Sequence, residues 1–308
     1  DEGIVQQPSA ALPGEKHRRQ KGAGFYRKGA AAPDFRMHEV LPRVESQAVE
    51  WIERAARDNP DRPFFCYMPL PAPHTPWVPV APHLGSSEAG WYGDFVHQVD
   101  SVIGSVLDAL DRTGMASNTL LIVTSDNGSH WLQADEKHFE HLANGDWRGQ
   151  KADIHEGGHR VPFLVRWPGK APAGVVRADL VCLTDLFATF AELTEQPIAE
   201  GEAEDSFSML PVLHGQEAGP SARSEVVHHS GAGVFAVRSG PWKLILGLGS
   251  GGFTNPKQVK AIAGGPKGQL YNLELDPSES DNLWSEQPEI VTRLTAKLNA
   301  WREAGRTR

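Results

Sequence analysis

An apolar run that ends abruptly in oxygen-bearing side chains most constrains the fold of this 308-residue chain. Residues 120–124 read Leu-Leu-Ile-Val-Thr, and Ser-Asp-Asn-Gly follows directly at 125–128. A short, continuously apolar strand is typical of a parallel sheet that helices cover on both faces. In open α/β sheets, ligands bind beyond the carboxyl ends of the strands. The run therefore predicts an α/β fold with a site at this strand end.

Helical and strand patterns alternate along the chain, as the spacing of apolar residues indicates. Helices are expected over residues 41–55, 95–110 and 184–194, and strands over residues 63–68, 119–124 and 161–167. Asp94 is a candidate N-cap of the second helix, and Gly114 is a stop signal after it. This alternation predicts a mostly parallel sheet flanked by helices.

Composition and periodicity divide the chain into three expected parts. Residues 1–35 are rich in Gly, Pro and Ala without apolar periodicity, which predicts an irregular segment. Residues 36–224 hold the alternating elements of the α/β domain. In residues 225–308, short strands over 226–229, 234–238, 242–246 and 269–273 precede a helical pattern over 288–302. This last part is expected to be a small antiparallel sheet with a terminal helix.

Charge and hydropathy argue against two classes of protein. The formal net charge is −9, from 30 basic and 39 acidic residues, so no basic surface for nucleic acid is expected. No apolar stretch reaches the roughly 20 residues of a membrane-spanning helix. The chain opens on Asp1 without a signal segment, which leaves its compartment open. Cys66 and Cys182 form no C-x-x-C pair and are expected to be two buried thiols.

Asp126 and Asn127 are the candidate metal ligands at the strand end. Adjacent carboxylate and amide oxygens suit calcium or magnesium better than zinc. Asp-Asn-Gly is also a favoured turn sequence, so an ordinary turn is the alternative.

Lys151 and His74 are the candidate catalytic residues. Lys151 lies in a Gly-rich stretch and offers a compact cation to sulfate or phosphate, although a solvated surface lysine is the alternative. His74 lies among five prolines at residues 69–79, which fix the backbone around a proton donor or an oxyanion partner. A loop histidine without a role is the alternative there.

Other histidines and one tryptophan are candidate substrate contacts. His228 and His229 lie at the end of the predicted strand 226–229 and either face the same cleft or are structural. His130 and Trp77 flank the two candidate motifs and complete the candidate substrate-binding set. The spacing of His130, His138 and His141 matches no zinc site.

The order of these motifs resembles the formylglycine-dependent (type I) sulfatases, the arylsulfatase branch of the alkaline phosphatase superfamily. The motifs are Pro-Ala-Pro-His-Thr-Pro at 71–76, Ser-Asp-Asn-Gly at 125–128, Gly-Gln-Lys at 149–151, Glu-Gly-Gly-His-Arg-Val-Pro at 156–162 and Trp-Pro-Gly at 167–169. A Leu-Tyr-Asn-Leu-Glu-Leu-Asp-Pro stretch at 270–277 is typical of the family's small subdomain. The resemblance implies an alkaline phosphatase-like sheet and the hydrolysis of sulfuric esters.

The resemblance also implies roles for single residues. Asp126 and Asn127 match the family's calcium ligands, and Lys151 and His74 match residues that bind the sulfate group, with His74 also near the leaving oxygen. In the family mechanism a hydrated formylglycine attacks sulfur, and calcium and basic residues stabilise the charge on the sulfate oxygens. The implied substrate is a sulfated small molecule or glycan. The family also favours a periplasmic or secreted location.

The departures from the family pattern are as informative as the match. The family's Asp-Asp pair, its Cys-x-Pro/Ala-Ser-Arg motif for formylglycine and its Gly-Lys-x-x-His-x-Gly segment are not in this sequence, and neither cysteine fits the nucleophile. Asp126 and Asn127 offer about two or three of the roughly six to eight oxygens that calcium takes. We therefore expect the C-terminal part of a sulfatase, a fragment that is inactive alone and holds calcium weakly.

Two alternatives remain at the level of the sequence. A phosphoesterase or phosphotransferase of the same superfamily would have a similar sheet, although such enzymes usually bind two transition metals. A non-catalytic glycan-binding pseudoenzyme would bind through residues such as Trp77, Trp131 and His229, without turnover.

Overall fold

The computed structural model describes residues 10–12, 15–16, 25–26, 29–219 and 222–308. The chain divides into two compact units. The first, here called the N-terminal unit, comprises residues 1–119 and 137–141, and the C-terminal unit comprises residues 120–136 and 142–308. The boundary expected at residue 225 lies inside the C-terminal unit and stays a prediction. Among the helices that the structure describes, none has the length and apolar character needed to cross a bilayer.

Four short strands begin the described part of the N-terminal unit. Strand β1 (Ala10–Leu12) pairs antiparallel with β4 (Gly29–Ala31), and β2 (Glu15–Lys16) pairs antiparallel with β3 (Phe25–Tyr26). The prediction that residues 1–35 are irregular is therefore wrong for these strands. Much of that segment lies outside the described residues.

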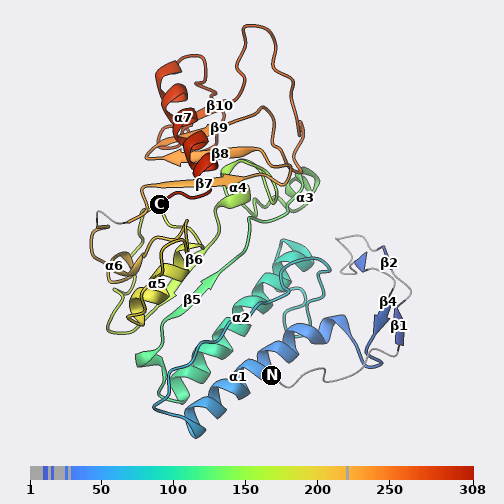
Figure 1. Cartoon of the computed structure of the whole chain (residues 1–308). Helices are drawn as coiled ribbons and strands as arrows, with labels where there is room; N and C mark the ends of the chain where they lie inside the picture. The colour runs from blue at the N-terminus through green and yellow to red at the C-terminus, as the bar shows by residue number, and fades with distance from the viewer. Residues whose placement is uncertain (1–9, 13–14, 17–24, 27–28, 220–221) are drawn as a thin grey trace. The chain divides into compact units, whose positions relative to one another are not determined.

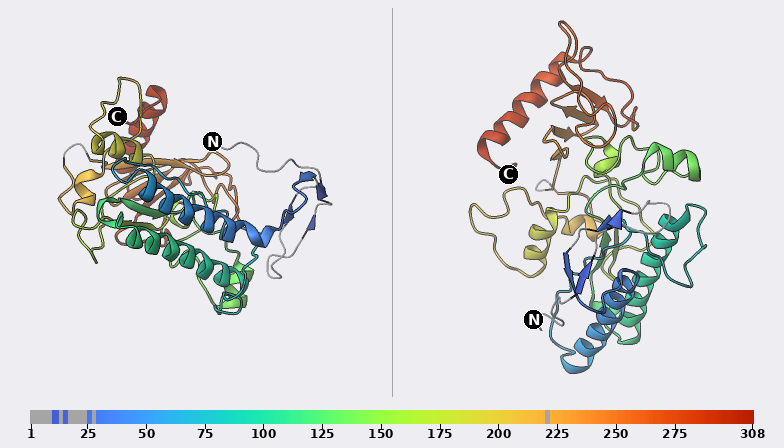
Figure 2. Two further views of the ribbon diagram at one scale, coloured as in Figure 1. Left: turned by 90° about the horizontal axis from the view of Figure 1, so that it is seen from below. Right: turned by 90° about the vertical axis from the view of Figure 1, so that its right-hand side faces the viewer.

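Two long helices, α1 (Val40–Asp58) and α2 (Gly90–Arg112), lie side by side in the N-terminal unit (Figures 1 and 2). Leu41 and Ile52 on α1 and Val102 on α2 are buried, and burial of such a side chain contributes about 1.5–3 kcal/mol. An ion pair of 2.7 Å between Arg112 and Glu53 links the two helices. Single turns of 3-10 helix, η2 (Met37–Glu39) and η3 (Ala116–Asn118), precede α1 and follow α2.

Helix α2 begins at Gly90, so the expected N-cap role of Asp94 is wrong. Asp94 is buried inside the helix, and its carboxylate accepts hydrogen bonds from the amides of Gly85 and Ser87, both at 2.9 Å. The Asp94 side chain therefore stabilises the loop that precedes α2 and does not cap the helix.

Residues 63–68 do not form the expected strand. Phe65 and Tyr67 are 74% and 78% exposed, and Cys66 is exposed as well, which corrects the expectation of a buried thiol. Cys182 is half-buried. An extended segment becomes a strand only when a neighbour takes its backbone hydrogen bonds, and the described residues provide no such neighbour here.

In the C-terminal unit, β5 (Leu121–Thr124) pairs with β6 (Phe163–Arg166) in antiparallel register. The α/β class is confirmed. The strand pairs within the described ranges are antiparallel, so the expected parallel pairing is not found among them. Between β5 and β6 lie only α3 (Gln133–Phe139) and the one-turn α4 (Glu156–His159).

The expected antiparallel sheet and terminal helix are confirmed. Strands β7 (Glu225–His229), β8 (Phe235–Ser239), β9 (Trp242–Ile245) and β10 (Gln269–Asn272) lie in the order β10-β9-β8-β7. Helix α7 (Pro288–Ala304) packs on this sheet (Figure 1). Their shared core consists of fully buried aliphatic side chains: Val237, Leu244, Leu270, Leu294 and Leu298. The remaining helices are α5 (Asp185–Leu193) and α6 (Leu210–Leu213).

Candidate functional site

The end of β5 presents Asp126 and Asn127 as the sequence predicts. Asp126 is exposed and Asn127 half-buried, and the Asn127 amide nitrogen donates to the Gly128 carbonyl at 3.1 Å. The Gly128 amide donates to the Gly158 carbonyl at 3.0 Å. A Cβ on Gly128 would lie 1.8 Å from the Gly157 carbonyl oxygen. Only glycine allows this approach, so the strand end is held against α4.

Lys151 is bonded through its backbone to the same strand end. Its amide donates to the Ser129 carbonyl at 3.2 Å. Asn144 reinforces this junction, because its side chain accepts from the Ser129 amide at 2.8 Å and donates to the Ser129 carbonyl at 3.0 Å. The structure therefore brings Lys151 beside the segment that carries Asp126 and Asn127. The catalytic and metal-binding roles of these three residues stay predictions.

Asp153 ties the Lys151 loop to the loops of the C-terminal sheet. Its carboxylate accepts from the Gln150 amide at 3.0 Å, the Phe253 amide at 2.7 Å and the Thr254 amide at 3.0 Å. The Thr254 hydroxyl donates to it as well, at 2.5 Å. A carboxylate with four donors fixes the backbone on both sides of Lys151, and sequence reasoning did not single it out.

A buried ion cluster holds α4, which follows the Lys151 loop. Lys243 on β9 is 0% exposed and pairs with Glu156 at 2.9 Å and Glu279 at 2.8 Å. The Glu279 carboxylate also accepts from the Glu156 amide at 2.6 Å. Burial alone would raise the pKa of Glu156, but Lys243 and Arg160 outweigh it and lower that pKa to about 2. For Glu279 burial prevails, and its pKa is raised.

Three histidines are enclosed near this cluster. Burial, with Lys243 nearby, lowers the pKa of His159 to about 4. Burial, with Arg148 and Lys243 nearby, lowers the pKa of His155 to about 3. Burial also lowers the pKa of His228 well below its usual value, and the His228 ring lies 4.2 Å from that of His159. These imidazoles are therefore neutral at pH 7.

The remaining predicted substrate contacts divide between interior and surface. His228 is half-buried with a fully enclosed Nε2, and its role in contacting substrate stays a prediction. Trp77 is only 2% exposed and packs against Tyr92, so the structure places it in the core rather than in a binding surface. His229 is exposed at the end of β7. His130 is half-buried, with its Nδ1 2.6 Å from the Gln150 side-chain oxygen next to Lys151.

His74 lies in the N-terminal unit, whereas Lys151 lies in the C-terminal unit. His74 is exposed, and its Nδ1 is 2.6 Å from the Thr75 carbonyl oxygen. A carbonyl oxygen can only accept a hydrogen bond, so Nδ1 carries a proton. The other ring nitrogen, Nε2, takes no part in this bond. Its joint action with Lys151 stays a prediction.

The described part of the chain does not show a complete calcium site. Among the residues that the structure describes, no group of three or more His, Cys, Asp or Glu side chains is placed to hold a metal. Asp126 and Asn127 supply about two or three of the roughly six to eight oxygens that calcium requires.

Comparison with known proteins gives a consistent result. The sulfatase family model matches residues 43–196. An N-acetylgalactosamine-6-O-sulfatase of Bacteroides thetaiotaomicron is 35% identical over 253 residues, which cover 78% of this chain and 47% of that protein. Human arylsulfatase D is 32% identical over 279 residues, 82% of this chain and 45% of that protein. The chain thus spans about half the length of these curated relatives.

Solved structures agree with this match. A structure whose title concerns glycosaminoglycan metabolism by Bacteroides thetaiotaomicron superposes with a TM-score of 0.75 at 31% identity, covering 90% of this chain and 57% of that one. A protein crystallised with a neocarrahexaose has a TM-score of 0.70 at 23% identity, covers 91% and 58%, and supports the fold alone. By its matched region, its relatives and its fold, the chain belongs to the sulfatase family.

Proposed function

We propose that this chain forms one side of the active site of a sulfuric ester hydrolase that removes sulfate from a sulfated carbohydrate or an aryl sulfate. The observation that carries the proposal is the hydrogen bond between the Lys151 amide and the Ser129 carbonyl. This backbone bond joins the residue that carries a cationic side chain to the segment that follows Asp126 and Asn127. Relatives named as sulfatases support the reaction class.

Lys151 and His74 have distinct proposed tasks. The Lys151 ammonium binds an oxygen of the sulfate group, because a compact cation suits a tetrahedral anion. Negative charge develops on the leaving oxygen as the bond to sulfur breaks, and a proton delivered there lowers the barrier. Since Nδ1 of His74 is engaged by the Thr75 carbonyl, His74 would deliver that proton from Nε2 as the imidazolium.

Asp126 and Asn127 are proposed ligands of a calcium ion whose other ligands, like the formylglycine nucleophile, would come from polypeptide outside these 308 residues. A bound calcium ion would offset negative charge on the sulfate oxygens. Asp126 and Asn127 would hold one side of that ion, since they offer about two or three of the oxygens that it takes.

The test compares this chain alone with the same chain extended by the sequence encoded in front of Asp1. Both are assayed with 4-nitrocatechol sulfate and 4-nitrophenyl phosphate. We expect turnover of the sulfate ester by the extended protein only, and a loss of about 10²- to 10³-fold in kcat for Lys151→Ala. Lys170→Ala, an exposed lysine in the same unit, is the matched control and should retain activity.

Three results would contradict the proposal. Turnover by the 308-residue chain alone would show that it holds its own nucleophile. Preference for the phosphate ester would assign the extended protein to a phosphoesterase. Binding of sulfated glycans without any turnover by the extended protein would make it a glycan-binding pseudoenzyme.

A further inference from the structure

We propose that a cavity beside the Lys151 loop is a subsite for a neutral sugar ring, the neighbour of the sulfated residue in a glycan substrate. The inference rests on the proposed function and adds a second recognition element to it. The cavity has a volume of about 430 Å³ and lies wholly in the C-terminal unit. This volume is in the usual range for small-molecule sites.

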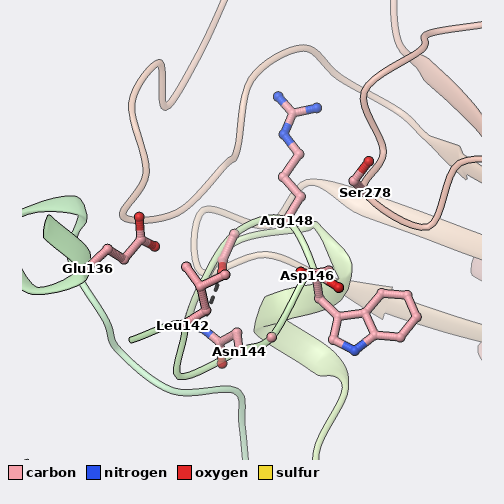
Figure 3. Close-up of a pocket in the computed structure, with 9 residues that line it drawn as sticks. Glu136, Leu142, Asn144, Asp146, Arg148 and Ser278 are labelled. Atoms are coloured by element: carbon pink, nitrogen blue, oxygen red, sulfur yellow. Dashed lines mark hydrogen bonds between the residues drawn. The ribbon is translucent and has the colours of Figure 1, made fainter. Parts of the chain in front are cut away.

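The chemistry of the lining favours a ligand rich in hydroxyl groups. Figure 3 shows Glu136 from α3, Asn144, Asp146 and Arg148 from the loop after it, and Ser278 from a third segment. The carboxylates accept from hydroxyls and the guanidinium donates to them. The Asn144 side-chain oxygen can accept, while its nitrogen already donates to the Ser129 and Gly149 carbonyls. Such a mixed set matches a pyranose, whose hydroxyls both donate and accept.

The charge of the lining selects against a second anionic group. Glu136 and Asp146 bring two negative charges, and Arg148 brings one positive charge. Arg148 is already engaged, since it donates to the Glu279 carbonyl at 2.5 Å and to the Tyr271 hydroxyl at 3.2 Å. A sulfated or uronic ring would meet net repulsion in this cavity, whereas a neutral hexose or N-acetylhexosamine would not.

Trp147 supplies an aromatic surface to the cavity. The Arg160 guanidinium lies 3.9 Å from the centre of its ring and holds it in place. Asn144 is fixed by its bonds to Ser129, and the Ser278 hydroxyl donates to Asp276 at 3.1 Å. Because these groups are positioned before binding, little side-chain entropy is lost when a ligand enters.

Two residues that line the cavity, Gly149 and Asn144, connect it with the Lys151 loop. Gly149 lines the cavity and lies two residues before Lys151, which places the two Cα atoms within about 7 Å. Asn144 lines the cavity and bonds to Ser129, whose carbonyl also accepts the Lys151 amide. A ring in the cavity would therefore lie next to a sulfate held by Lys151, as adjacent residues of one oligosaccharide do.

The test is isothermal titration of the 308-residue chain with N-acetylgalactosamine, with methyl β-galactoside and with inorganic sulfate. We expect weak, saturable binding of at least one sugar, and binding about tenfold weaker in Asp146→Asn and Trp147→Ala. Asp146→Asn keeps the shape of an exposed side chain, so it tests recognition even where Trp147→Ala disturbs the fold. Trp91→Ala, an exposed tryptophan of α2, is the control and should bind as the parent does.

The outcomes separate this inference from the proposed function. Absence of saturable sugar binding would overturn the subsite, as would binding that Asp146→Asn leaves unchanged. Displacement of the sugar by inorganic sulfate, with loss of binding in Lys151→Ala, would place the sugar at the sulfate site and also overturn it. Failure of the extended protein to release sulfate would refute the hydrolase and would leave the sugar titration unaffected.

Discussion

Replacement of Lys243 by methionine is expected to cost about 3–5 kcal/mol of unfolding free energy. Lys243 and Glu279 are both 0% exposed, and Glu156 is 4% exposed. The ammonium forms ion pairs of 2.9 Å and 2.8 Å with the two carboxylates. Methionine keeps most of the side-chain volume but removes the ammonium that the two buried carboxylates share. Glu156 then keeps Arg160 at 2.8 Å, whereas Glu279 faces it without the cation, which is the costly way to break a buried ion cluster.

The magnitude can be checked against a surface pair in the same unit. Lys297 pairs with Glu225, and the Lys297 side chain is 38% exposed. Lys297→Met makes the same chemical change and should cost less than about 1 kcal/mol, because solvent screens an exposed pair. The assay is urea unfolding of both variants at pH 7.5, followed by tryptophan fluorescence and by circular dichroism.

The pH dependence of the Lys243→Met variant supplies a second check. Without the ammonium, Glu156 and Glu279 are expected to bind protons more readily in the folded state than in the unfolded state. The penalty should therefore shrink as the pH falls from 7.5 toward 5. A loss below about 1 kcal/mol at pH 7.5, similar to the surface control, would refute the reasoning and show that water reaches the cluster.

Three further predictions follow from single contacts. Gly128→Ala should lower the free energy of unfolding by about 1–3 kcal/mol, because the new Cβ would lie 1.8 Å from a backbone carbonyl oxygen. Gly104→Ala is the control, since its Cβ would enter open space and should not destabilise the protein. Thermal unfolding of the two variants makes the comparison. The folded-state pKa values of His155 and His159, about 3 and about 4, lie below the unfolded value. The stability that these neutral rings contribute should therefore be fully present above pH 6.5 and fall by about 1.4 kcal/mol per imidazole per pH unit between pH 6.5 and 4. Urea unfolding at several pH values in this range measures the slope, and hydrated rings would give no such slope. Asp153→Ala should speed hydrogen exchange in the Lys151 loop more than in α7, and equal protection in both proteins would contradict the anchoring role of the carboxylate.

The local periodicity of the chain predicted the elements that need few long-range contacts. The amphipathic spacing of residues 41–55 predicted α1, and alternation with turn residues predicted the sheet from β7 to β10 and the helix α7. The two-residue turn between β8 and β9 is an example, because Gly240 adopts a φ of +56° that favours glycine. Such features depend on residues that are close in the sequence, so they can be predicted without a structure.

The pairing of strands and the burial of single side chains could not be predicted from such local patterns. An apolar run at 63–68 has the composition of a strand, yet no neighbour takes up its hydrogen bonds in the described part of the chain. Trp77 and His228 have the residue types of a binding surface, yet one is in a core and the other has an enclosed ring nitrogen. Side-chain type states what a residue can do, and its neighbours in space decide whether it does so.

The sequence by itself determined the family resemblance, the position of Asp126 and Asn127 after an apolar strand, and the presence of Lys151 in a glycine-rich loop. Only the tertiary structure revealed how that loop is held, because Asp153, Lys243 and Glu279 form bonds across separations of 100, 87 and 123 residues. Helix and strand periods repeat over a few residues and leave a trace in the sequence. A buried ion cluster joins residues that only folding brings together, so no local pattern marks it.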